Sequence, residues 1–230
     1  MPSQSKEALR DVAIVLIASV AAFLGEVALA ERLPWGAEAR GVLAVLTGTA
    51  AAIWLTLRNH GSLAELGFVR PKRWSTVPLW VLGILVAFVV TQNAAPLLLA
   101  PFFDLPQPDL SRYDMIRGNL PVAIGFAIML PLAAAVPEEI LYRGFLINRL
   151  ILVLGPGRSR TILAVLLQSL IFGAVHFQWG IGGIVATSLM GAVWGAAFLA
   201  CGRNLWIVIL AHSAAHLALV AQLYFSPANV

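Results

Sequence analysis

Two adjacent glutamates, Glu138 and Glu139, are the residues of this sequence best suited to acid–base chemistry. They follow a long apolar run, where an ionised carboxylate at the membrane centre costs about 3 kcal/mol even on lenient insertion scales. Arg143 lies four residues after Glu139, the favourable spacing for an ion pair on a helix. That pair would leave Glu138 on a different face, available as a general base. The alternative is a solvated acid pair at a helix end on the cytoplasmic surface.

Three of the four histidines lie downstream of the acids, within or beside apolar runs. His176 stands near the end of one run, a position more typical of an interfacial residue than of a catalyst. His212 and His216 are four residues apart in the last run, so their imidazoles share a helix face and both need polar partners in lipid. The spacing of this pair favours a functional role over a structural one. We predict that the acids and imidazoles from separate helices meet at one site.

Two prolines, Pro131 and Pro137, precede the acids and lack a backbone donor. We therefore predict a helix that is kinked or restarted immediately before Glu138. If Pro137 opens a helical turn, the carboxylates fall in its first turn, where the helix dipole favours negative charge.

The composition excludes a soluble domain, because 60% of the residues are hydrophobic and only 11% are charged. Soluble domains carry about 25% charged residues. We predict an all-α fold, a polytopic transmembrane helix bundle that forms a single membrane domain over residues 1–230. The apolar runs of about 20 residues give seven spans, with an eighth, irregular segment as the alternative, and the fourth helix is expected to continue to about residue 152. The spans lie near 11–30, 41–57, 77–99, 119–137, 161–177, 182–200 and 204–224.

The distribution of the fifteen lysines and arginines predicts the orientation. A cytoplasmic N-terminus places eleven of them in inside segments and four in outside segments. The net charge of +4 then reflects topology, and we expect no nucleic-acid partner. The polar segment 100–118 is predicted to be an ordered exterior loop, with substrate access as an alternative role. Cys201 is the single cysteine, so the chain forms no internal disulfide.

Three motifs of this sequence resemble, in order, those of the CAAX protease and bacteriocin-processing family of intramembrane proteases, also called CPBP or Abi. The motifs are Glu138-Glu139-x-x-x-Arg143, Phe172-x-x-x-His176 and His212-x-x-x-His216. The resemblance covers residues 117–225, which it marks as the catalytic core. It implies that Glu138 and His176 hold and activate water, that Glu139 and Arg143 support that carboxylate, and that His212 stabilises the oxyanion. The family usually has asparagine at the position of His216, and histidine can also bind a metal or titrate.

The resemblance leaves two mechanisms open. In the metal-free mechanism, which we prefer, Glu138 is the general base and His212 and His216 donate to the oxyanion. No cofactor is then required. In the alternative, a zinc ion is bound by His176, His212, His216 and Glu138.

We therefore expect an intramembrane endopeptidase that hydrolyses a peptide bond of a membrane-associated protein or peptide. Its partners are the substrate and the lipid bilayer, and its expected location is the plasma membrane of a prokaryote. The alternatives are the metal-dependent form of the same protease, a transporter that uses the same acids and histidines as an ion path, and a non-catalytic membrane partner such as an immunity protein. No residue pattern indicates a pocket for a prenyl group.

Overall fold

The computed structural model describes residues 2–29 and 41–226 of the chain. Within these ranges all regular structure is helical and no strand occurs, which confirms the predicted all-α class. The α-helices are α1 (Pro2–Ala28), α2 (Val42–His60), α3 (Val77–Leu99), α4 (Leu120–Leu130), α5 (Val136–Glu138), α6 (Asn148–Leu154), α7 (Arg158–Ala174), α8 (Gly180–Ala200) and α9 (Leu205–Phe225). Short 3₁₀ turns are η2 (Leu63–Leu66), η3 (Trp74–Thr76), η4 (Ser111–Ile116) and η7 (Phe177–Trp179), and two π-helical segments are η5 (Pro131–Ala135) and η6 (Glu139–Ile147).

Six helices of the described ranges are long and apolar enough to cross a membrane, so the chain is an integral, multi-pass membrane protein. The predicted count of seven is not confirmed. The helix that corresponds to the predicted span 161–177 is α7, which has 17 residues, somewhat fewer than the roughly 20 that a bilayer core requires.

The acidic motif lies in the middle of one long helix. Segments α4, η5, α5, η6 and α6 follow one another without a break and form a 35-residue helix over Leu120–Leu154, so the expected continuation past the acids is confirmed. The predicted restart at Pro137 is wrong, and the carboxylates do not occupy a first turn. The backbone remains helical through both prolines. Pro131 is the first residue of the π-helical segment η5, and Pro137 lies in α5, between the two π-helical segments.

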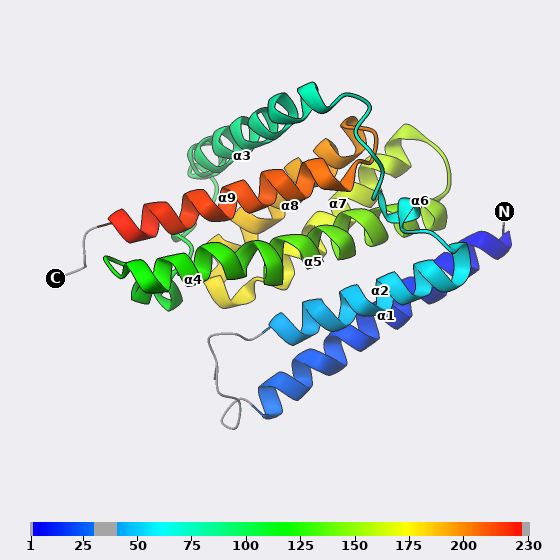
Figure 1. Ribbon diagram of the computed structural model, residues 1–230, viewed down its shortest axis with the longest axis horizontal. Helices are drawn as coiled ribbons and strands as arrows, with labels where there is room; N and C mark the ends of the chain where they lie inside the picture. Colours follow the sequence, from blue (N-terminus) through cyan, green and yellow to red (C-terminus); the bar gives the residue numbers. More distant parts are fainter. Residues whose placement is uncertain (1, 30–40, 227–230) are drawn as a thin grey trace.

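The helices are arranged as a hairpin, a central group and a covering helix (Figure 1). Helices α1 and α2 pair side by side to form the hairpin, and α1 also contacts α6. The long helix, α7, α8 and α9 form the central group. Helix α3 is the covering helix and packs against α8 and α9. The site described below therefore lies among helices that are far apart in the sequence.

Helices α7 and α8 pack closely because glycines face the partner helix. A Cβ atom at Gly173 would lie 2.6 Å from the carbonyl oxygen of Ile184, and one at Gly191 would lie 3.0 Å from the Cα atom of Ser169. No larger residue fits at Gly173 without separating the helices. Because Gly173 is three residues before His176, this contact also fixes the position of that histidine against α8.

Polar contacts hold the hairpin together and attach it to the central group. The Glu26 carboxylate accepts hydrogen bonds from the backbone N–H groups of Gly41 (2.9 Å) and Leu43 (2.8 Å), at the start of α2. Near the other end of the hairpin, Asp11 accepts a hydrogen bond from Asn59 at 3.0 Å. Asp11 also pairs with Arg149 of α6 at 3.6 Å. Both carboxylates therefore have structural partners.

Candidate active site

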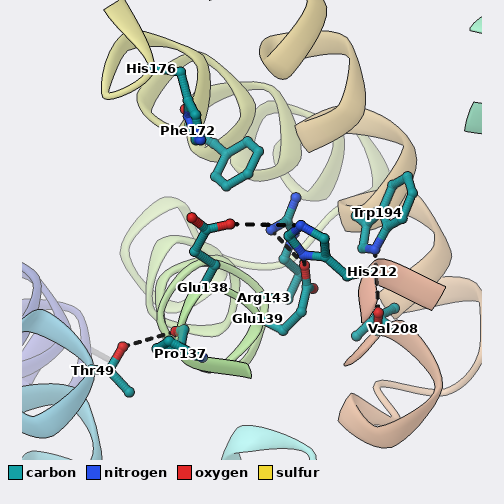
Figure 2. Close-up of polar contacts among 10 residues, drawn as sticks. All are labelled: Thr49, Pro137, Glu138, Glu139, Arg143, Phe172, His176, Trp194, Val208 and His212. Atoms are coloured by element: carbon teal, nitrogen blue, oxygen red, sulfur yellow. Dashed lines mark hydrogen bonds and ion pairs between the residues drawn. The ribbon is translucent and has the colours of Figure 1, made fainter. Parts of the chain in front are cut away.

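The centre of the site is a buried ion pair with a histidine attached. Glu139 is fully buried, and its Oε1 atom accepts a hydrogen bond from Nη1 of Arg143 at 2.9 Å, as the spacing predicted. The same oxygen accepts a hydrogen bond from Nδ1 of His212 at 2.7 Å (Figure 2). Glu139 therefore joins the long helix to α9 and orients the His212 ring.

Glu138 faces a different direction from Glu139. Its side chain is 14% exposed, and its Oε2 atom lies 3.8 Å from Nε2 of His212. Figure 2 shows the Glu138 carboxylate between the His212 ring and the segment that carries Phe172, near the end of α7, and His176, just after it. The His212 ring thus has a carboxylate near each of its nitrogens.

The hydrogen bond to Glu139 determines what His212 can do. A carboxylate only accepts hydrogen bonds, so Nδ1 of His212 carries a proton. In the neutral ring Nε2 then has a lone pair, and only the doubly protonated imidazolium donates from both nitrogens. Donation from Nε2 to an oxyanion formed from substrate therefore requires the imidazolium form.

His176 is held by contacts with its own chain. Its Nδ1 atom is 2.6 Å from the carbonyl oxygen of Phe172, so Nδ1 is the protonated nitrogen and Nε2 is left with a lone pair. The ring packs between Phe172, at 4.8 Å between ring centroids, and Trp179, at 4.9 Å. This arrangement presents a fixed hydrogen-bond acceptor rather than a mobile interfacial side chain.

Glu138 and His176 line the same cavity, which has a volume of about 1080 Å³. The cavity lies between the α1–α2 hairpin on one side and the long helix and the end of α7 on the other. Its hairpin side is apolar except for Ser19, and the charged residues of its lining are Glu138 and Arg112, beside the titratable His176. The apolar residues of the hairpin side include Val12, Val15, Leu16, Phe23 and Val45. This apolar wall could not be predicted from the sequence, because apolar residues that face a cavity look like residues that face lipid.

The two C-terminal histidines lie next to each other, and neither is among the residues that line the cavity. The ring centroids of His212 and His216 are 4.5 Å apart. The Nδ1 atom of His216 is buried and has no hydrogen-bonding partner among the described residues. His212 is therefore the member of the pair that approaches Glu138 directly. In the described ranges, no three histidine, cysteine or acidic side chains are grouped so that they could hold a metal ion.

Several residues that sequence reasoning missed support the site. Trp194 is fully buried on α8, donates from Nε1 to the carbonyl of Val208 at 3.3 Å, and packs edge-on against His212 at 5.7 Å. The ring of Phe172 lies 4.5 Å from the guanidinium carbon of Arg143. Thr49 of α2 donates to the carbonyl of Pro137 at 2.9 Å. In the sequence these aromatic and hydroxyl residues are indistinguishable from ordinary core residues.

The segment between α3 and α4 is folded against the site. The backbone N–H of Asp109 donates to the carbonyl of Trp179 at 3.1 Å, and that of Gly118 donates to the carbonyl of Tyr224 at 3.1 Å. Tyr113, on η4, lines the cavity together with Glu138. Burial raises the pKa of Tyr113 above its ordinary value of 10, so its phenol stays protonated at neutral pH. The predicted order of this segment is confirmed.

One of three comparisons with known proteins found a match. Residues 120–218, which carry all six candidate residues, match the family model described as type II CAAX prenyl endopeptidase Rce1-like. Searches of the curated proteins and of the solved structures found no significant match.

Proposed function

We infer, from the match of residues 120–218 to the model of the Rce1-like family of type II CAAX prenyl endopeptidases, that this chain is an intramembrane endopeptidase with Glu138 as its general base. The observation that carries this proposal is the shared cavity of Glu138 and His176, two residues that are remote in the chain. The substrate is a membrane-associated protein or peptide, and the apolar hairpin side of the cavity suits a lipid-modified or strongly apolar segment.

The proposed reaction begins with a water molecule held between Glu138 and His176. The water donates one proton to the Glu138 carboxylate and the other to the lone pair on Nε2 of His176, which aims an oxygen lone pair at the substrate carbonyl. Attack forms a carbon–oxygen bond while Glu138 takes the first proton. The carbonyl oxygen becomes an oxyanion, which imidazolium His212 stabilises through Nε2–H. When the carbon–nitrogen bond breaks, Glu138 returns its proton to the departing amine.

The remaining polar residues act through these groups. Glu139 keeps Nδ1 of His212 protonated and fixes the ring, and Arg143 offsets the charge of Glu139. These are positioning roles. We place His216 in a supporting hydrogen-bonding role beside His212, where the family usually has asparagine.

The test is cleavage of a reporter peptide by purified protein in detergent or proteoliposomes. Glu138→Ala and His176→Ala are each expected to lower cleavage by about 10²–10⁴-fold, the range for general acid–base groups, with membrane insertion intact. Undiminished cleavage by either variant would overturn the assigned roles. Saturable ion flux without proteolysis would instead support the transporter.

The metal-free mechanism needs its own measurement. We expect full activity in the presence of strong chelators and no stoichiometric zinc by elemental analysis. His216→Asn should retain most of the activity, because asparagine can hydrogen-bond but is a poor zinc ligand. Inhibition by chelators that is reversed by added zinc would replace this mechanism with the metal-dependent one.

We also propose that the N-terminus is cytoplasmic, that α7 completes a seven-span topology, and that the protein resides in the plasma membrane of a prokaryote. The uneven distribution of lysine and arginine supports the orientation. Reporter fusions at the 61–73 loop and after residue 226 are expected to report opposite sides of the membrane.

A further inference from the structure

A second, smaller pocket lies between α1 and α2, apart from the cavity described above. It is found at the end of the hairpin away from Glu26, where the start of α1 meets the end of α2 (Figure 1), and its volume is about 330 Å³. Its lining combines two arginines, one amide and three apolar side chains: Arg10, Arg58, Asn59, Ile14, Trp54 and Leu55. The proposed reaction uses none of these residues.

The two arginines lie where the apolar runs of the hairpin end. Residues 12–25 and 41–57 contain no charged side chain, and Arg10 and Arg58 stand just outside these runs at the same end of the hairpin. Both arginines are exposed. A long basic side chain at the end of a membrane helix lays its stem along apolar surface and places its charge among the lipid headgroups. The two guanidinium groups are therefore at the depth of a phospholipid phosphate.

The local carboxylate does not neutralise these arginines. The guanidinium carbon of Arg58 is 5.1 Å from the ring centroid of Trp54, and no carboxylate in the part of the chain that the structure describes lies within 4.0 Å of Arg58. Arg10 is 3.2 Å from Asp11, but Asp11 also contacts Arg149 at 3.6 Å. One carboxylate thus faces two arginines while Arg58 has none, so the cluster retains positive charge that a phosphate can complete.

The apolar part of the pocket is open at the surface of the hairpin. Trp54 is 54% exposed and Ile14 is 39% exposed. Tryptophan is enriched at the border between lipid tails and headgroups, because its ring is apolar and its N–H is polar. A free phosphate ion would use the guanidinium groups alone, whereas a phospholipid would also cover these exposed apolar side chains.

We propose that this pocket binds an anionic phospholipid, with its phosphate between Arg10 and Arg58 and the upper part of an acyl chain against Ile14 and Trp54. A zwitterionic lipid fits less well, because its cationic headgroup would come close to the two arginines. The bound lipid joins α1 to α2 at the end of the hairpin opposite the Glu26 contacts. It thereby stabilises the pairing of the two helices that form the apolar wall of the cavity.

The experiment measures lipid binding to the detergent-purified protein by native mass spectrometry, with phosphatidylglycerol and phosphatidylcholine of identical acyl chains as probes. We expect the unmodified protein to bind phosphatidylglycerol about 10–100-fold more tightly, the range for hydrogen bonds to charged groups. Arg58→Gln should remove most of this preference. Arg58→Lys should keep part of it, because an ammonium group retains the charge but not the two-point contact.

Two further variants make the test specific. Arg10→Gln should also lower the preference, and it gives an independent measurement in a protein that retains Arg58. Arg73→Gln is the matched control: it removes the same charge from an exposed arginine that does not line the pocket, and it should leave the preference unchanged. Circular dichroism checks that each variant is folded.

Four results would overturn the assignment. Equal binding of both lipids by the unmodified protein, or an unchanged preference in folded Arg58→Gln, would show that the pocket does not select an anionic lipid. An equal loss of preference in Arg73→Gln would show general attraction of anionic lipid to a basic surface. Inorganic phosphate is the third probe, and displacement of phosphatidylglycerol by phosphate at a comparable concentration would show a site for the free anion instead of the lipid.

Discussion

Two buried carboxylates of this protein, Asp11 and Glu139, are alike in burial but differ in the groups that surround them. Asp11, in the hairpin, is 2% exposed and Glu139, in the long helix, is fully buried. Asp11 contacts Arg10 at 3.2 Å and Arg149 at 3.6 Å, and Glu139 contacts Arg143 at 2.9 Å. Neither burial nor an arginine partner therefore distinguishes a catalytic centre from a structural contact.

The difference lies in the second group beside each carboxylate. Asp11 has an additional amide donor in Asn59, and no described imidazole or second acid accompanies it. Glu139 has His212, whose other nitrogen faces Glu138 at the cavity. A buried charge becomes part of a candidate catalytic centre when its partner also reaches a titratable group that substrate can contact.

The largest expected effect comes from Glu139→Gln. It leaves the buried Arg143 without its anion and should lower the free energy of unfolding by about 3–5 kcal/mol, together with loss of cleavage. Denaturant unfolding in detergent and the peptide assay measure the two effects. The double variant with Arg143→Met should recover most of the stability and none of the cleavage. Unchanged stability of the single variant would show that the pair is not a buried contact.

Asp11→Asn should have the second-largest effect and should affect stability alone. The Asn59 contact can persist, but Arg149 loses its negative partner, so we expect about 2 kcal/mol of destabilisation. Cleavage per folded molecule should stay unchanged, because Asp11 contacts no residue of the proposed centre. A fall in kcat at full stability would contradict the contrast between the two carboxylates.

Trp194→Phe tests how firmly His212 must be held. The change removes the hydrogen bond to Val208 and should cost about 1 kcal/mol. We also expect a several-fold fall in kcat with little change in KM, since the His212 ring loses packing on one side. Trp206→Phe, a half-exposed tryptophan on the same helix as His212, serves as a control and should change kcat little.

The smallest effect is expected for Thr49→Val, which removes one polar contact between the hairpin and the long helix. It removes one hydrogen bond to the Pro137 carbonyl and should destabilise the protein by about 1 kcal/mol or less. The change should leave kcat within about twofold, provided that the helix and not the hairpin sets the direction of Glu138. A large fall in kcat would show that the hairpin also positions the general base.

The parts of the site that follow from spacing could be predicted from the sequence. Four-residue spacing on a helix predicted the Glu139–Arg143 pair, and apolar runs predicted most of the membrane helices. Motifs on three separate runs indicated that distant residues act together, and Glu138 and His176 do line one cavity.

Other features could not be predicted, for physical reasons. The missing donors of Pro131 and Pro137 imply a disturbance of the helix, but they do not say whether the helix ends or widens into π turns. The role of Trp194 depends on which face of α8 meets α9, and that is a property of packing.

Two separate portions of the chain line the cavity. Its proposed general base, Glu138, lies within the family-matched residues 120–218, whereas its apolar wall comes from α1 and α2, which precede them. We therefore expect the proposed hydrolysis and substrate choice to be separable by recombination. A chimera that exchanges this hairpin for that of a protein matching the same family model should take on the donor's substrate preference and keep the proposed reaction chemistry of this chain.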